Sequence, residues 1–244
     1  MFVSKSPEFR HPELRHLAFT NGHPTFAPIS VSTPVTWRGA SWRPLARGLK
    51  RVFDLAASAG ILLVFSPALL AIALLIRLES PGPAFFRQER IGLHGRRFRM
   101  WKFRTMYHQA ERGAALRQAT RHDPRVTRIG GFLRRTSLDE IPQCINVLLG
   151  DMSVVGPRPH APGTCAGGRP FEHITHRYAD RHCVKPGMTG LAQVRGWRGE
   201  TDTEEKLLRR LESDLEYIES WNPLVDLKIV GRTIWAVLAA RNAY

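Results

Sequence analysis

The stretch LAASAGILLVFSPALLAIALLI, residues 55–76, carries no charge and decides the class of fold. As one helix it would be about 33 Å long, which is enough to reach through the hydrocarbon core of a bilayer. A buried core helix is the alternative, but helices of soluble proteins seldom stay apolar on every side over this length. We therefore expect a membrane helix here.

Proline interrupts this stretch near its middle, where Pro67 follows Ser66. Proline removes a backbone hydrogen bond and clashes with the preceding turn, so a bend is expected, with the Ser66 hydroxyl available to the freed carbonyl. Basic residues flank the stretch on both sides, and such residues favour the cytoplasmic side of a membrane. Because one straight span cannot place both flanks there, we expect a re-entrant helix that is broken at Ser66-Pro67. The basic residues are Arg38, Arg43, Arg47, Lys50 and Arg51 before it, and Arg77, Arg87, Arg90, Arg96, Arg97, Arg99, Lys102 and Arg104 after it.

The whole chain is strongly basic, with 36 Lys and Arg against 21 Asp and Glu in 244 residues, a net charge of +15. This surplus indicates an anionic partner, which composition alone leaves open among nucleic acid, an anionic membrane surface and a phosphorylated substrate. The three cysteines are widely spaced and form no CxxC motif, which argues against a disulfide framework.

Residues 85–106 alternate as two short strands around a turn near Gly92 and Gly95. Strand periodicity puts Lys102 and Arg104 on one face, where two neighbouring cations would suit a phosphate group. A solvated basic edge strand is the alternative interpretation.

An acidic pair, Asp139 and Glu140, stands out in this basic chain. With Ser137 it also forms a capping box, in which Ser137 would cap a helix and Glu140 would reach back to its amide. The chemical interpretation gives the two carboxylates separate tasks, because adjacent helical side chains point about 100° apart. One carboxylate can attack a phosphoryl group while the other holds Mg²⁺, and Arg134 would neutralise phosphate charge.

Proline fixes the backbone on both sides of one arginine in Pro157-Arg158-Pro159. Such a rigid loop could present Arg158 to a phosphate or a nucleobase, and an ordinary stiffened loop is the alternative.

Taken together, these motifs resemble the bacterial sugar transferases, the monotopic phosphoglycosyl transferases that load a sugar phosphate from a nucleotide sugar onto polyprenyl phosphate. The resemblance extends from Lys50 to about Leu238. The matching stretches are KRVFDLAASAGILLVFSPALLAIALLIRLESPGPAFFRQERIG, KFRTM, DPRVTRIGGFLRRTSLDEIPQCINVLLGDMSVVGPRP, KPGMTGLAQVRGWRGETDT and DLEYIESWNPLVDLKIVGRT.

The resemblance implies roles for individual residues. Asp139 would be the catalytic nucleophile, with Glu140 beside it as a second catalytic residue. Both carboxylates would be Mg²⁺ ligands. The phosphate-binding residues would be Arg134, Lys102 and Arg104. The nucleotide-binding residues would be Pro157, Arg158 and Pro159, and the break of the membrane helix would be Ser66 and Pro67.

The resemblance also implies a reaction and a location. Asp139 would accept a sugar phosphate from a UDP-sugar and pass it to undecaprenyl phosphate, which initiates exopolysaccharide or other glycoconjugate synthesis. The motif GWRGETDT, residues 196–203, favours UDP-glucose as the donor. The expected partners are both substrates, an anionic membrane surface and a second copy of the chain, without nucleic acid. The expected location is the cytoplasmic face of the bacterial inner membrane.

The expected fold is α+β and mostly helical, with a re-entrant membrane helix, a small β-hairpin and a catalytic helical domain. Residues 1–45 would be a disordered polar tail, 46–80 the membrane helix and 81–244 the cytosolic, membrane-associated catalytic domain. Residues 204–220 are predicted to be a helix capped from Thr201, and a second amphipathic helix follows Asn222-Pro223. Its apolar face could lie in the membrane interface or pack on the domain's own core.

Two other functions fit parts of the sequence. Residues 87–104 interleave basic and aromatic side chains, as in a membrane-tethered nucleic-acid-binding module. A scaffold protein could also use the fold without chemistry. The acidic pair distinguishes these alternatives, because nucleic-acid binding needs no such pair and a scaffold would tolerate its loss.

Overall fold

A computed structural model describes residues 18–20, 23–25, 43–108 and 123–239. The chain divides into two units, Met1–Arg38 and Gly39–Tyr244. In the first, β1 (Ala18–Thr20) pairs antiparallel with β2 (His23–Thr25). The predicted disordered tail otherwise falls outside the described residues.

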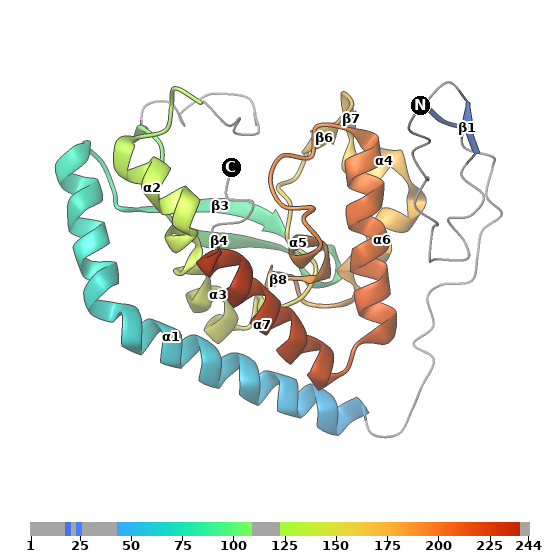
Figure 1. Ribbon diagram of the computed structural model, residues 1–244, viewed down its shortest axis with the longest axis horizontal. Helices are drawn as coiled ribbons and strands as arrows, with labels where there is room; N and C mark the ends of the chain where they lie inside the picture. Colours follow the sequence, from blue (N-terminus) through green and yellow to red (C-terminus); the bar gives the residue numbers. More distant parts are fainter. Residues whose placement is uncertain (1–17, 21–22, 26–42, 109–122, 240–244) are drawn as a thin grey trace. The chain divides into compact units, whose positions relative to one another are not determined.

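The second unit is mostly helical, as predicted, and holds the predicted antiparallel hairpin (Figure 1). Very short strands form one further parallel pair and one further antiparallel pair. In chain order its elements are α1 (Arg43–Glu79), β3 (Phe85–Ile91), β4 (Arg97–Phe103), α2 (Arg128–Thr136), a 3-10 turn (Leu138–Glu140), α3 (Gln143–Leu149), β5 (Ser153–Val155), β6 (Cys165–Ala166), β7 (Arg169–Pro170), α4 (Phe171–Ile174), a 3-10 segment (His176–Cys183), β8 (Gly187–Thr189), α5 (Leu191–Val194), α6 (Glu204–Ser220) and α7 (Pro223–Leu238).

The long helix α1 continues through Pro67. Proline has no amide hydrogen, so the carbonyl of Leu63, four residues earlier, loses its helical donor. The Ser66 hydroxyl donates to that carbonyl at 2.8 Å, as the sequence predicted. Figure 1 shows that α1 changes direction along its length.

The two halves of α1 have different surroundings. Near its start, Lys50 donates to Asp226 of α7 at 2.6 Å, and Arg51 donates to the last carbonyls of α3 at 2.6 and 2.9 Å. One turn later, buried Asp54 accepts from the amide of Val154 in β5 at 2.9 Å. These contacts fix the first half of α1 to the rest of the unit.

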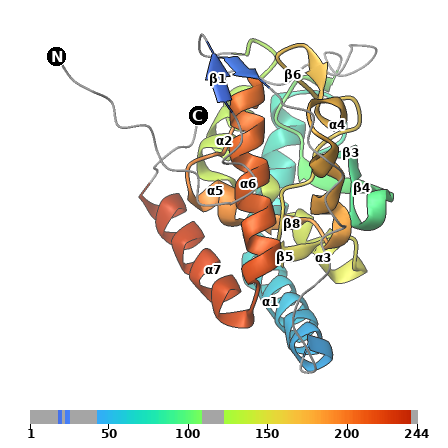
Figure 2. The same ribbon diagram turned by 90° about the vertical axis from the view of Figure 1, so that its right-hand side faces the viewer.

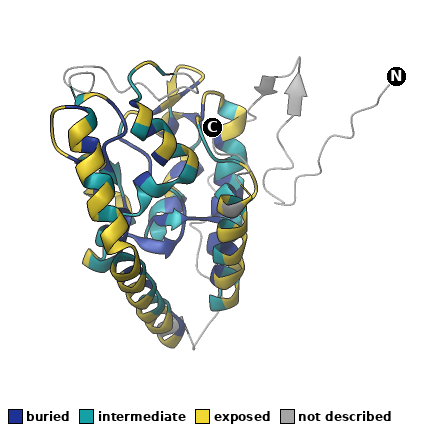
Figure 3. Ribbon diagram, turned by 60° about the vertical axis from the view of Figure 1, so that its left-hand side comes forward, coloured by how far each residue is buried: buried dark blue, intermediate teal, exposed yellow. Residues whose placement is uncertain are grey.

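The later, apolar half of α1 is largely exposed, as Figure 3 shows in yellow. Of its most apolar 18-residue window, only 6% is buried, although the helix is long and apolar enough to cross a membrane. A soluble core helix would be covered by protein instead. This half of α1 therefore needs an apolar environment that the described part of the chain does not supply.

The predicted hairpin is confirmed, and its seven paired positions run from Phe85 opposite Phe103 to Ile91 opposite Arg97. Buried Asn146 of α3 accepts from the amide of Trp101 at 2.9 Å. Its side-chain amide donates to the carbonyl of Arg99 at 2.8 Å. Helix α3 is thereby held against β4, which sets the position of the acidic turn that precedes it.

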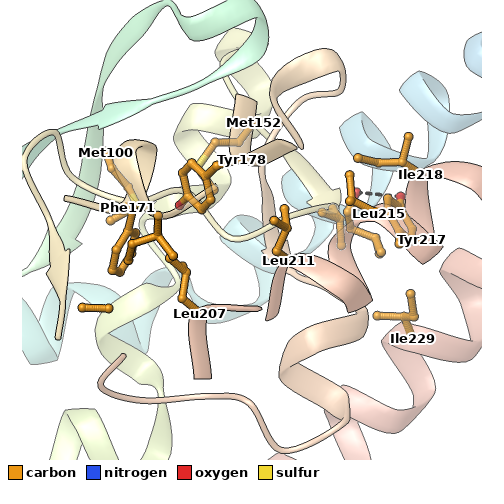
Figure 4. Close-up of a cluster of buried hydrophobic side chains, with 14 of the residues drawn as sticks. Met100, Met152, Phe171, Tyr178, Leu207, Leu211, Leu215, Tyr217, Ile218 and Ile229 are labelled. Atoms are coloured by element: carbon orange, nitrogen blue, oxygen red, sulfur yellow. Dashed lines mark hydrogen bonds between the residues drawn. The ribbon is translucent and has the colours of Figure 1, made fainter. Parts of the chain in front are cut away.

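Apolar side chains from β4, the α3–β5 region, the 160–183 segment, α6 and α7 form the main core (Figure 4). Burial of these side chains is the main force that holds α6 against the rest of the unit. The labelled members are Met100, Met152, Phe171, Tyr178, Leu207, Leu211, Leu215, Tyr217, Ile218 and Ile229.

Both predicted C-terminal helices are present at the predicted positions, and they diverge from a short connection (Figures 1 and 2). The cap of α6 is Thr203, which accepts from the amide of Lys206, and not Thr201 as predicted. Thr201 is buried instead. Helix α7 buries Ile229 and leaves a set of large apolar side chains exposed. They are Leu224, Leu227, Ile234, Trp235 and Val237.

Candidate active site

A cavity of about 400 Å³ lies between the hairpin, the α2–α3 connection, the Pro-Arg-Pro loop and α6. Basic side chains dominate the charged groups that line it, against Asp139, Glu200 and Asp214. Such a cavity favours a ligand with several negative charges. The basic residues are Arg90, Lys102, Arg125, Arg134, Arg158, Arg181 and Arg210.

The acidic pair lies on a 3-10 turn, and the capping box, which was the alternative interpretation of these residues, does not form. Ser137 has φ 61°, a left-handed conformation that ends α2, and its side chain caps nothing. Pro142 prevents a regular helix from running through the pair, so α3 begins only at Gln143. The Ser137 hydroxyl instead accepts from Arg198 at 2.8 Å, which ties the turn to the GWRGETDT segment.

Glu140 is surrounded by cations. It accepts from Lys102 at 3.1 Å and from both terminal nitrogens of Arg158, and Arg198 approaches within 4.0 Å. Burial alone would raise the pKa of Glu140, but attraction to Arg158, Lys102 and Arg198 outweighs it. The pKa therefore lies well below its ordinary value, and Glu140 is ionised.

Asp139 has the opposite surroundings. Its side chain lines the cavity, the residue is 7% exposed, and no described residue donates a hydrogen bond to its carboxylate. Burial and the neighbouring charge of Glu140 raise the pKa of Asp139 to about 6, against the attraction of Lys102 and Arg134. A carboxylate without partners at the edge of a cationic cavity is free to attack or to bind a cation.

Arg134 lies in the last turn of α2, and its Nε donates to the hydroxyl of Thr105 at 3.0 Å. Gly130 brings α2 close to the chain after β4, because a Cβ at this position would stand 2.1 Å from the carbonyl oxygen of Thr105. The guanidinium of Arg134 therefore lines the cavity with Lys102, as the sequence predicted for a pair of phosphate ligands.

Arg104 does not join them. Its guanidinium is buried and donates to the carbonyls of Ile76, Ser80 and Pro81 at 2.7 to 3.2 Å. Arg104 therefore satisfies the C-terminal carbonyls of α1, where a cation also complements the helix dipole. This geometry corrects its prediction as a phosphate ligand. The strand ends at Phe103, so the alternation that placed Arg104 beside Lys102 stops one residue too early.

The Pro-Arg-Pro loop is held from behind. Arg181 donates to the carbonyl of Arg158 at 2.7 Å and pairs with Asp214 of α6 at 2.6 Å. Gly187 donates to the carbonyl of Pro157 at 2.9 Å. Arg158 and Pro159 line the cavity, whereas Pro157 does not. The loop therefore presents one arginine to the cavity from a fixed backbone, as expected.

The donor set fits Mg²⁺, which takes one or two carboxylates and completes its shell with water and substrate phosphates. Both oxygens of Asp139 are available, and Glu140 Oε2 accepts one close hydrogen bond, from Arg158. The described residues hold no group of three or more His, Cys, Asp or Glu side chains for a metal. Phosphate oxygens would therefore have to supply part of the shell.

Several lining residues were missed in the sequence. Arg90 is the clearest, because the hairpin register pairs it with Phe98 on the face that carries Lys102. Extending the face across the turn would have found it. Arg181 and Asp214 gave no comparable signal, since their pairing joins segments 33 residues apart.

Comparison with known proteins identifies the family of this chain. The family described as "Bacterial sugar transferase" matches residues 45–240. The UDP-glucose:undecaprenyl-phosphate glucose-1-phosphate transferase of Escherichia coli K12 is 52% identical over 198 residues, covering 81% of this chain and 42% of that protein. The transferase of the same name from Caulobacter vibrioides is 51% identical over 195 residues, covering 80% and 72%.

The "Exopolysaccharide production protein PSS" of Rhizobium leguminosarum bv. phaseoli is 48% identical over 196 residues, 80% of this chain and 98% of that protein. The chain spans about two fifths of the length of several other curated relatives. The chain belongs to the bacterial sugar transferase family. This membership favours the transferase interpretation over the nucleic-acid-binding and scaffold alternatives.

Proposed function

We propose that this protein transfers glucose 1-phosphate from UDP-glucose to undecaprenyl phosphate and thereby initiates exopolysaccharide or related glycoconjugate synthesis. The observation that carries the proposal is the carboxylate of Asp139, which accepts no hydrogen bond from the described residues and lines a cavity dominated by basic side chains. Relatives at about half identity carry names that state this donor and this acceptor.

The reaction has two steps. An oxygen of Asp139 attacks the sugar-bearing phosphorus of the donor, and the bond from that phosphorus to the bridging oxygen breaks. UMP leaves with the bonding electrons, and a glucosyl-phosphoryl aspartate forms. An oxygen of the lipid phosphate then attacks the same phosphorus, which forms the lipid diphosphate sugar and returns the carboxylate.

The surrounding side chains support both steps. Lys102 and Arg134 face the phosphate and offset the negative charge that gathers on its oxygens. Glu140 fixes Lys102 and Arg158 in place. When bound between Asp139, Glu140 and the phosphates, Mg²⁺ would withdraw charge from the phosphoryl oxygens.

A radiolabel experiment tests the reaction. Membranes that contain the protein are incubated with labelled UDP-sugars, Mg²⁺ and undecaprenyl phosphate, and the lipid is extracted. We expect label in lipid from UDP-glucose, and none after chelation with EDTA until Mg²⁺ is restored. Incubation with donor alone should release UMP and leave a sugar-phosphate adduct on Asp139. Release of UMP only when lipid is present would contradict the covalent intermediate.

We also propose that α1 is re-entrant and that α7 lies in the membrane interface, so that residues 46–80 anchor a domain from 81 to 244 on the cytoplasmic face. The exposed apolar half of α1, its proline and the basic flanks support this arrangement. Lys228 and Arg232 of α7 are exposed near its outward apolar side chains, which suits anionic headgroups.

Cysteine labelling tests this arrangement. In a variant without the native cysteines, Leu45→Cys and Leu78→Cys lie at the two ends of α1. Both should react with a membrane-impermeant maleimide in inverted vesicles and neither in intact spheroplasts. Reaction of one end only from the outside would show a helix that crosses the membrane.

A further inference from the structure

Arg90 is a half-buried cation that forms no ion pair with any of the described residues. It lies on β3, lines the cavity, and its Nε has no hydrogen-bond partner among the described residues. Its side-chain partner is neutral, because one terminal nitrogen donates to Gln88. A buried charge that is not paired is costly, so such a residue in a cavity indicates a missing counter-charge.

Other cations make this cost larger. Burial and repulsion from Arg158 lower the pKa of Arg90 to about 10, and Glu140 opposes the shift only in part. Glu140 already accepts hydrogen bonds from Lys102 and Arg158, so its negative charge mainly offsets those two cations. The site around Arg90 is therefore electrostatically incomplete without an anionic ligand.

The position of Arg90 separates it from the attacked phosphate. Arg134 is held at Thr105, beyond the Phe85–Phe103 end of the hairpin, whereas Arg90 lies opposite Phe98 near the turn. Ile91, the next residue, donates its amide to the carbonyl of His160 at 3.1 Å, so this end of β3 lies beside the Pro-Arg-Pro loop. A diphosphate whose sugar-bearing phosphate meets Asp139 would extend its second phosphate toward Arg158.

We propose that Arg90 binds the second phosphate of the nucleotide-sugar donor, the one that leaves as nucleoside monophosphate. The proposal rests on the proposed function and names a binding residue for it. A guanidinium can donate two parallel hydrogen bonds to a phosphate, so its loss should weaken the nucleotide specifically. The phosphate of the lipid acceptor has the same chemistry, and the test must distinguish the two.

The test compares Arg90→Gln with Arg87→Gln. Arg87 lies on the same strand but on the opposite face, is exposed, and stacks over Trp101 at 4.4 Å. Calorimetry with UMP should give a Kd raised at least about 10-fold for Arg90→Gln and unchanged for Arg87→Gln. In Arg90→Gln, the rate at which labelled UMP is incorporated into UDP-glucose in the absence of lipid should also fall. The KM for undecaprenyl phosphate should stay within about twofold of the wild-type value.

Thermal stability gives a second readout. Removing a half-buried cation that lacks a counter-ion among the described residues should raise the Tm of ligand-free Arg90→Gln, and excess UMP should stabilise this variant less than wild type. A residue that only supports the fold would lower Tm on substitution. If Arg90→Gln does not fold, Arg90→Lys keeps the charge without the paired donors, and its Kd for UMP should still rise several-fold.

The outcomes decide between the claims. Wild-type UMP affinity in the Arg90 variants, or an effect confined to the lipid acceptor, would overturn the role of Arg90. Failure of wild-type protein to bind UMP or to use any UDP-sugar would instead defeat the proposed function.

Discussion

Two buried carboxylates on this cavity, Asp139 and Asp214, differ in what surrounds them. Asp214 meets the guanidinium of Arg181 at 2.6 and 3.0 Å, within a network that also includes Tyr178 and His160. Asp139 has no hydrogen-bond donor among the described residues. The first carboxylate therefore supports the loop that carries Arg158, whereas the second is available for chemistry.

The largest expected effect comes from the free carboxylate. Asp139→Asn should lower transfer at least about 10⁴-fold, because an amide cannot form the phosphoryl intermediate. Its Tm should stay near the wild-type value, since no described contact is lost. The measurement is label transferred to lipid, with circular dichroism melting as the control. Substantial turnover by this variant would remove the distinction between the two carboxylates.

The paired carboxylate should behave in the opposite way. Asp214→Asn leaves the buried guanidinium of Arg181 without its counter-charge, so stability should fall by about 3–5 kcal/mol. Denaturant unfolding measures this loss. Asp202→Asn is the matched control, because Asp202 forms an exposed pair with Lys206 and should unfold near the wild-type midpoint. Equal midpoints for both variants would contradict a structural role for Asp214.

Glu140 combines features of both carboxylates, because it is paired with cations and is also adjacent to the proposed nucleophile. Glu140→Gln should lower kcat about 10²-fold, because Lys102 and Arg158 lose the charge that positions them. Donor-alone trapping on Asp139 should slow in parallel. A variant that forms the adduct at the wild-type rate would show that Glu140 contributes only to folding.

The smallest effect is a pH dependence in the network of Asp214. Burial, with the charge of Arg181, lowers the pKa of His160 to about 2. Below about pH 6.5 the unfolded chain takes up a proton there and the folded chain does not, so stability falls as the pH decreases. The slope is about 1.4 kcal/mol per pH unit.

His160→Asn should remove that slope between pH 6.5 and 4.5, as unfolding at a series of pH values would show. His182 has a pKa lowered to about 4 and should preserve part of the total dependence. An unchanged profile in the variant would mean that His160 is protonated in the folded protein.

Local pattern predicted the parts of the fold that depend on nearby residues. The length of the apolar stretch predicted a long helix where α1 lies, and strand alternation predicted the hairpin. The helix of residues 204–220 was predicted at its observed bounds. The acidic pair, Lys102 and Arg134 could be predicted because each lies in a short motif. The cavity brings the motif of Lys102, the motif of Arg134 and Asp139, and the Pro-Arg-Pro motif together.

The errors arose where a local pattern competes with tertiary geometry. Ser137-x-x-Glu140 has the form of a capping box, but Pro142 and the ion pairs of Glu140 with Lys102 and Arg158 hold it in another conformation. Arg104 was predicted to bind phosphate in the cavity, but its guanidinium donates to carbonyls at the end of α1 instead. In both cases the residues that set the observed conformation lie outside the short motif on which the prediction was based.

The attachment of α1 by Lys50, Arg51 and Asp54 has a mechanical consequence. If α1 enters lipid and a lipid phosphate is the acceptor, as proposed, this fixed base would set the height of the cavity above the headgroups. The acceptor phosphate then has to arrive at one depth, and a thinner or thicker bilayer would carry it out of register with Asp139. The activity of the protein would then depend on the thickness of the bilayer.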